Sequence, residues 1–198
     1  MAYADEQQAQ SPVALMVAPA DGGEPHAFAY ISQRLALAWS PTQSRIAVAT
    51  TSFMDGSVYE ELQLIDIPSG ETRTVVKDHF AAYFWSPNGT RILYARRQLG
   101  NPVGTWVVVD VESGKSTDII DFSPSRTLTQ VFQYFDQYAL SHRLWSPDSR
   151  HFVFAGSAGP DSHPSTAMQS PGIYVVEATP KATPQLLSDG PIAFWSPQ

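Results

Sequence analysis

The groups in this chain best suited to chemistry on a substrate are a few carboxylates and histidines. A loop at residues 157–171 is rich in Ser, Gly and Pro and contains Asp161 and His163. Ser, His and Asp form hydrolytic triads, and His and Asp also bind metals. The sequence contains no Gly-x-Ser-x-Gly elbow and no His-Glu-x-x-His pair, the local signatures of those chemistries. A surface loop is therefore the preferred interpretation, with Asp161 and His163 kept as candidate ligand-binding residues.

Aromatic side chains are concentrated in residues 122–138, together with Arg126 and Asp136. They are Phe122, Phe132, Tyr134, Phe135 and Tyr138. Because aromatic rings supply large contact areas, this segment is a candidate arm for gripping a ligand or partner. The alternative, which we prefer, is a loop that folds its rings over its own structural unit. Arg96 and Arg97 form the largest basic cluster and add candidate ligand contacts.

Other chemical groups recur at matching positions along the chain. Acidic residues precede predicted turns at Asp66, Asp110 and Glu177, and arginines follow predicted turns at Arg45, Arg91 and Arg150. The carboxylates are predicted to cap turns, and the arginines to pair or stack at an outer rim. A catalytic centre needs its groups to converge once, so repetition favours a structural role. The remaining histidines do not share positions, and no metal site or cofactor is predicted; they are His26, His79, His142 and His151.

The elements that position these groups are organised around a repeated tripeptide, Trp-Ser-Pro. Its four copies begin at Trp39, Trp85, Trp145 and Trp195, at intervals of 46, 60 and 50 residues. Such periods are typical of propellers and solenoids. The four tryptophans are predicted to end the innermost strands and to pack between structural units, so that Trp85→Ala would cost roughly 3–5 kcal/mol of stability.

Each full repeat predicts four short strands. An apolar run leads into the Trp, and a β-rich run follows the turn, at 46–50, 92–95 and 152–155. A third strand ends at the acidic residue, and a fourth follows the second turn. Four antiparallel strands in about 45–50 residues are the blade of a β-propeller. A β-sandwich is the alternative, but it would not repeat both turns in phase.

The repeats resemble those of TolB-like, WD-repeat-like β-propellers, whose blades carry Trp-Ser-Pro-Asp-Gly, a basic residue and a strand. They are also similar to the propeller domains of prolyl-oligopeptidase-type serine peptidases. The resemblance covers nearly the whole chain from Val13. Only Asp148 keeps the motif's Asp; Asn88 is a near match and Thr42 departs from it. The resemblance implies the fold and a periplasmic or extracellular setting, but the motif residues build blades and not a site.

Composition narrows the classes of function. The chain has 198 residues, 12% aromatic residues, 16 prolines and no cysteine, which excludes disulfides and thiol catalysis. Its net charge of −7 and lack of a larger basic cluster argue against a nucleic-acid partner. No apolar run is long enough for a transmembrane helix, and residues 1–10 lack the pattern of a signal peptide.

The repeats divide the chain into a series of expected units. They are a polar leader or tag (1–12), a partial blade (13–33), full blades (34–78, 79–138 with the insertion 122–138, and 139–190) and the first strand of a further blade (191–198). Strands are expected at 13–17 and 26–31 within the partial blade. Either the two ends pair into one defective blade, or the chain is a piece of a larger ring. The second interpretation is preferred because the sequence stops within a motif.

Loop lengths predict one functional side. Turns between the first and second strands, and between the third and fourth, are short, whereas the other loops are long. Long loops on a rigid scaffold usually carry binding. The preferred hypothesis is a non-catalytic scaffold that binds a protein, peptide or envelope ligand. The alternatives are a propeller that gates a hydrolase domain outside this chain, and a sugar or lactone enzyme, for which no converging set of groups is found.

Overall fold

The computed structural model describes residues 2–5, 13–31, 34–51, 58–97, 103–159, 162 and 170–196. An N-terminal sheet contains β1 (Ala2–Asp5), β2 (Val13–Val17) and β3 (His26–Ile31). A second sheet has ten strands, and strands that are consecutive in the sequence are neighbours in it. Its strands are β4 (Arg34–Trp39), β5 (Arg45–Thr51), β6 (Tyr59–Asp66), β7 (Thr72–Trp85), β8 (Arg91–Arg97), β9 (Gly104–Asp110), β10 (Ser116–Pro124), β11 (His151–Ala158), β12 (Gly172–Glu177) and β13 (Gln185–Asp189). Helix α1 (Arg126–Phe132) follows β10.

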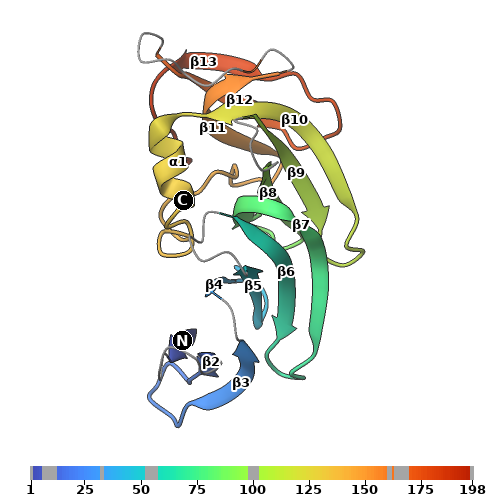
Figure 1. The fold of residues 1–198 in the computed structure, drawn as a ribbon, viewed down its shortest axis with the longest axis vertical. Helices are drawn as coiled ribbons and strands as arrows, with labels where there is room; N and C mark the ends of the chain where they lie inside the picture. Colours follow the sequence, from blue (N-terminus) through green and yellow to red (C-terminus); the bar gives the residue numbers. More distant parts are fainter. Residues whose placement is uncertain are drawn as a thin grey trace.

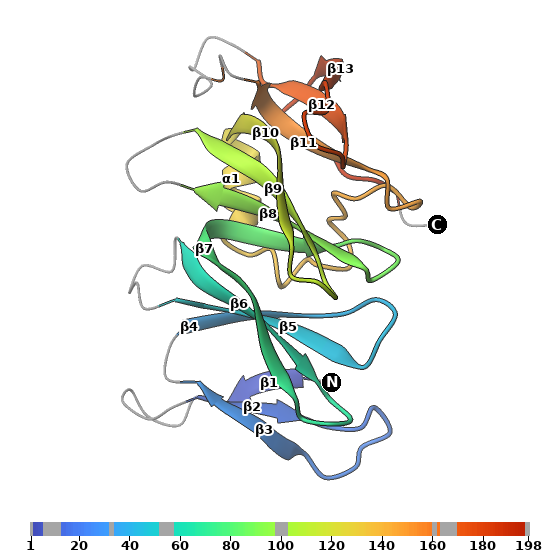
Figure 2. The same cartoon turned by 90° about the vertical axis from the view of Figure 1, so that its right-hand side faces the viewer.

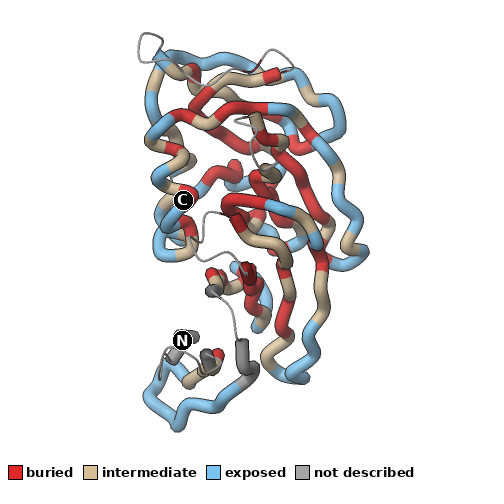
Figure 3. Tube along the Cα trace, in the orientation of Figure 1, coloured by how far each residue is buried: buried red, intermediate tan, exposed pale blue. Residues whose placement is uncertain are grey.

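The ten-stranded sheet forms an arc in which successive repeats lie side by side (Figure 1). We call residues 34–78, 79–138 and 139–190 the first, second and third repeats. The predicted second, third and fourth strands of each repeat are confirmed, and every pair of neighbouring strands is antiparallel. Strands β8 and β9 are buried along most of their length because a repeat covers each side (Figure 3). This explains their continuous apolar runs.

Two strands each pair with strands of two successive repeats, and one of them, β7, also crosses the predicted boundary at residues 78/79. Strand β7 pairs with β6 through its first half and with β8 through residues 80–85, with register shifts near the crossing. Strand β10 likewise pairs with β9 and then, through Phe122–Pro124, with β11. The predicted boundary between residues 78 and 79 falls inside β7, which continues through Lys77, Asp78 and His79. Neighbouring repeats therefore share a strand.

Three predicted segments differ from the structure. Residues 2–5, expected in a polar leader, form β1 and pair with β2. The apolar run at 139–145, expected as the first strand of the third repeat, does not form a strand. Residues 139–141 form turns, and Trp145 makes an isolated bridge to Phe152. Residues 191–196 form no strand; the backbone N–H of Trp195 donates to Arg143 O (2.9 Å), so this segment lies beside the third repeat. The prediction of a strand at the C-terminal end was wrong for these described residues.

The predicted turn-capping carboxylates are confirmed at two turns. Asp66 Oδ1 accepts hydrogen bonds from Ser69 N (3.0 Å) and Ser69 Oγ (2.7 Å). Asp110 Oδ1 accepts the matching pair from Ser113, at 2.8 and 2.7 Å. These bonds hold the pKa of both carboxyls below its usual value. At the third turn the bond comes from the main chain, where Thr179 N donates to Glu177 O (2.8 Å).

The tryptophans join successive repeats. Trp85 Nε1 donates to Ala38 O in the first repeat (3.2 Å), and Trp145 Nε1 donates to Phe84 O in the second (3.0 Å). Each acceptor is the residue just before the preceding Trp of the tripeptide. Trp39 packs against a separate cluster that contains Leu15 of the N-terminal sheet. The prediction that these rings pack between units is confirmed for Trp85 and Trp145.

Short turns lie together on one side of the arc, where the sequence predicts them. The turns joining β4 to β5 and β9 to β10 lie on one side of the arc (Figure 2). Strands β8 and β9 reach the opposite side at their other ends (Figure 2). Helix α1 lies on the concave side, where the innermost parts of the repeats meet (Figure 1).

Candidate functional site

The aromatic residues predicted as a binding arm divide into a buried set and an exposed set. Phe122, Phe132 and Phe135 are fully buried. Phe122 stacks on Trp106 with ring centroids 4.4 Å apart, and Phe132 meets the same ring edge-on at 5.8 Å. These three rings belong to the core and offer no ligand contact in this structure. Their assignment as binding residues is corrected by their burial.

Helix α1 anchors the segment that follows it. Ser125 caps the helix, because its Oγ accepts a hydrogen bond from Leu128 N (3.0 Å). Leu128 and Phe132 are spaced four residues apart and are both buried, so one side of the helix faces the core. Ser125 Oγ also donates to Pro191 O (2.5 Å), which ties the helix start to the C-terminal segment.

The exposed set lies immediately after the helix. Tyr134, Tyr138 and Leu140 are 50%, 46% and 79% exposed. Tight turns hold this stretch, with Gln137 N donating to Tyr134 O (3.1 Å) and His142 N donating to Tyr138 O (2.9 Å). We call Tyr134, Tyr138, Leu140 and His142 the aromatic patch. Large apolar side chains that are solvent-exposed on an ordered backbone are a candidate contact surface.

Other aromatic rings pack against the aromatic patch. The His142 ring lies 4.7 Å from the Tyr138 ring and 4.4 Å from the Phe194 ring, centroid to centroid. Phe135, one residue after Tyr134, packs on Tyr83 at 4.9 Å. The exposed rings of Tyr134 and Tyr138 therefore project from a segment that Phe135 anchors in the core. Leu140, His142 and Phe194 were not predicted as site residues, because nothing in their local sequence pattern sets them apart.

Asp136 sits between the patch and the first repeat. It accepts hydrogen bonds from Gln137 N (3.0 Å) and from the backbone N–H of Leu37 in β4. Burial nevertheless raises the pKa of the Asp136 carboxyl above its usual value, against the lowering effect of those bonds. The carboxyl thus joins the insertion to the innermost strand of the first repeat, and its charged form is disfavoured there.

Replacing Asp136 with Asn is expected to raise thermal stability relative to wild type more at pH 7 than at pH 3. A carboxyl with a raised folded-state pKa stabilises the fold below its unfolded pKa, and that contribution is lost as pH rises through the folded pKa. Asn removes this loss and retains an amide oxygen that can accept both bonds. Melting temperatures of the two proteins across this pH range measure the difference.

Asp148→Asn is the matched control with the opposite sign. Hydrogen bonds from Ser146 and Arg150 lower the pKa of Asp148 from 3.8 to about 2. Its contribution is therefore present above pH 3.8 and is lost as pH falls towards 2. The control should be less stable than wild type at pH 7, with the gap closing in acid. If the difference in melting temperature from wild type changed with pH in the same direction for both variants, the opposite pKa shifts assigned to Asp136 and Asp148 would be contradicted.

The other predicted site residues do not converge on the aromatic patch. Arg96 Nε contacts Asp78 Oδ2 (2.6 Å) and Arg96 Nη1 contacts Asp118 Oδ2 (2.7 Å), so this guanidinium ties β7, β8 and β10 together. Arg97 ends β8, and Arg126 is exposed in the first turn of α1. Asp161 and His163 lie outside the described residues.

Within the described ranges, no group of three or more His, Asp or Glu side chains is arranged to hold a metal ion. The described histidines lie on separate elements; His26 begins β3 and His151 begins β11, while His142 is in the patch. No helix in the described part of the chain is long and apolar enough to cross a membrane. The aromatic patch is therefore the candidate contact surface.

Comparisons with solved structures identify the architecture. TolB from Acinetobacter baumannii aligns with a TM-score of 0.54 and 19% identity over 89% of this chain. An oligogalacturonate lyase from Vibrio parahaemolyticus aligns with a TM-score of 0.62 and 15% identity over 91% of this chain. The β-propeller domain of the trilobed protease from Pyrococcus furiosus aligns with a TM-score of 0.52 and 14% identity over 94%. The fold is that of a β-propeller.

This β-propeller chain spans less than two thirds of the structures it matches, namely 38%, 44% and 57% of those three chains. No protein-family model matches the sequence, and no curated protein matches it. The predicted fold class and the resemblance to TolB-like and peptidase propellers are confirmed. At these identities the similarity extends to the fold alone.

Proposed function

We propose that this propeller is a binding scaffold that holds a protein or peptide partner on the aromatic patch. The observation that supports the proposal is the exposure of Tyr134, Tyr138 and Leu140 on a segment anchored by Phe135. Anchoring matters because a partner that binds an already ordered surface does not have to supply the free energy of ordering it.

The chemistry of the patch favours a peptide or protein partner over other classes. Tyrosine offers a broad apolar ring and one hydroxyl, and for this reason it is enriched at protein interfaces and in binding loops. A net charge of −7 opposes the approach of nucleic acid. Arg143 donates from Nε to Leu140 O (3.0 Å), which places a cation at the edge of the patch. A partner segment with apolar and acidic residues would complement this surface.

A selection from a random peptide library against the whole chain tests the proposal. Peptides that bind the wild type are expected to lose at least about tenfold in affinity to the double variant Tyr134→Ser/Tyr138→Ser, because tyrosines at the centre of an interface often contribute more than 1 kcal/mol each. Fluorescence polarisation with labelled peptides provides the affinities. Near-equal melting temperatures for the two proteins would show that the loss is local, since both rings are about half exposed.

Leu187→Ser is the matched control. Leu187 is 56% exposed on β13, an edge strand with all its residues exposed, and lies outside the patch. Its replacement should leave peptide affinity unchanged. If the selected peptides bound the double tyrosine variant as tightly as wild type, or lost affinity with Leu187→Ser alone, the patch would not be the binding surface.

A further inference from the structure

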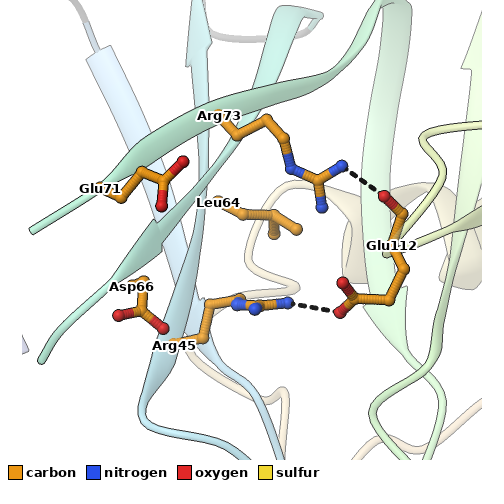
Figure 4. Close-up of a pocket in the computed structure, with 6 residues that line it drawn as sticks. All are labelled: Arg45, Leu64, Asp66, Glu71, Arg73 and Glu112. Atoms are coloured by element: carbon orange, nitrogen blue, oxygen red, sulfur yellow. Dashed lines mark hydrogen bonds and ion pairs between the residues drawn. The ribbon is translucent and has the colours of Figure 1, made fainter. Parts of the chain in front are cut away.

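A polar pocket separates the first and second repeats on the side of the short turns. Its volume is about 200 Å³, and its lining residues are Arg45, Leu64, Asp66, Glu71, Arg73 and Glu112. Figure 4 shows the guanidinium groups of Arg45 and Arg73 both directed towards Glu112, with Leu64 between them. The residues that line the pocket are distant in sequence from the aromatic patch, so a ligand of this pocket would bind apart from the proposed partner surface.

The boundary between the second and third repeats shows what the recurring arginine normally does. Arg91 Nη1 donates to Ala178 O (3.2 Å), and its Nη2 contacts Ser149 O. The Arg91 guanidinium also lies 5.1 Å from the centre of the Trp145 ring. Its partners there are neutral main-chain oxygens and an aromatic face. At this boundary the arginine is fully used in joining two repeats.

At the first boundary a second arginine takes over this task. Arg73 Nη1 donates to Glu112 O (2.7 Å), and its Nη2 contacts Val111 O. Val111 corresponds to Ala178, because each directly follows the acidic residue that ends the third strand. The second repeat has Thr117 where the first has Arg73, so this substitution occurs at one boundary.

Arg45, the counterpart of Arg91, therefore makes none of the main-chain contacts across the boundary that Arg91 makes, among the described residues. Its Nη1 contacts Glu112 Oε1 (3.1 Å), and among described residues the Arg45 guanidinium makes no other hydrogen bond. The Arg45 side chain is 19% exposed, whereas that of Glu112 is 72% exposed. A partly buried guanidinium is thus paired with a carboxylate that solvent can readily separate from it, since exposed ion pairs contribute little.

We propose that this pocket binds a carboxylate group at Arg45, in exchange with the side chain of Glu112. The planar guanidinium presents donors that match the two oxygens of a carboxylate, and Leu64 provides an apolar wall beside it. Asp66 is occupied by Ser69, but its charge and that of Glu71 disfavour ligands with several negative charges. The ligand is therefore a single carboxylate, carried by a small molecule or by an acidic side chain of a partner.

The Nε–H resonance of Arg45 in a ¹H–¹⁵N correlation spectrum reports this binding directly. We would titrate the whole chain with acetate, as a free carboxylate, and with a capped Gly-Glu-Gly peptide, as an acidic side chain. In the variant Glu112→Gln, which lacks the competing carboxylate, the saturable shift should occur at about fivefold lower ligand concentration than in wild type. This factor corresponds to the upper end of the free energy that an exposed ion pair contributes, here the Arg45–Glu112 pair that the ligand must displace in wild type. In the variant Arg45→Gln, the amide resonances of neighbouring residues should no longer shift when either ligand is added.

Arg150→Gln is the control, because Arg150 is the recurring arginine of the third repeat and is largely exposed beside Asp148. The Arg150→Gln variant should bind each ligand with the same affinity as wild type. Saturation by the peptide alone would identify a partner's acidic side chain as the source, and saturation by acetate alone would identify a free carboxylate. The proposal is overturned if Glu112→Gln shows no saturable shift with either ligand, or if Arg45→Gln binds as tightly as Glu112→Gln.

Discussion

Replacement of Trp145 with alanine is expected to lower the free energy of unfolding by about 3–5 kcal/mol. The Trp145 ring is fully buried, its Nε1 donates to Phe84 O (3.0 Å), and the Arg91 guanidinium lies 5.1 Å from its centre. Alanine removes the ring and leaves both the Phe84 carbonyl and Arg91 without this partner. The loss therefore combines a cavity with broken contacts between the second and third repeats.

Urea denaturation followed by circular dichroism measures this loss. Trp145→Phe keeps an aromatic ring and removes the N–H donor, so it should cost less than the alanine variant. Trp85→Ala, for which the sequence alone suggested the same range, should also cost less, because Trp85 is only partly buried. A loss below about 1 kcal/mol for Trp145→Ala would contradict the role of this ring in joining repeats.

Replacement of Phe135 with alanine is the second substitution with a large expected effect, about 3–5 kcal/mol. The Phe135 ring packs on Tyr83 (4.9 Å), Tyr59 (5.9 Å) and Phe84 (6.0 Å), which belong to two repeats. Through Tyr59 it connects the turns that carry the aromatic patch with the first repeat. The variant should therefore also weaken binding of peptides selected on the patch.

Tyr134→Ala, one residue earlier, is the matched control. Because Tyr134 is half exposed, its loss should change the free energy of unfolding by no more than about 0.5 kcal/mol. Chemical denaturation of both variants under one set of conditions gives the comparison. Equal losses would mean that the division of this segment into an anchoring ring and an exposed ring is incorrect.

Local turn chemistry made much of the fold predictable. Asp66 and Asp110 precede Ser and Gly at the same spacing, and the same short-range hydrogen bonds form at both turns. Strands between such turns were correctly placed because Pro, Asn and Gly limit where a strand can end. The packing of Trp85 and Trp145 between units followed from their regular position in the repeat.

The parts that could not be predicted depend on contacts distant in sequence. In the aromatic segment, Phe135 is buried and Tyr134 exposed because of rings on β7, which local pattern does not reveal. Asp78 looks like a loop residue, but the Arg96 side chain neutralises it and lets β7 continue. The exchange of roles between Arg45 and Arg73 likewise becomes visible only when two turns are brought together.

The strand that crosses from the first repeat into the second determines how this arc can move. Strand β7 is hydrogen-bonded to β6 on one side of the crossing and to β8 on the other, and Asp78 at the crossing contacts both Arg96 (2.6 Å) and Tyr94 (3.2 Å). Changing the angle between these repeats requires bending a paired strand, because no free hinge joins them there. The curvature of the concave surface is therefore set by the strand pairing itself, and a partner of the kind proposed would have to match that shape.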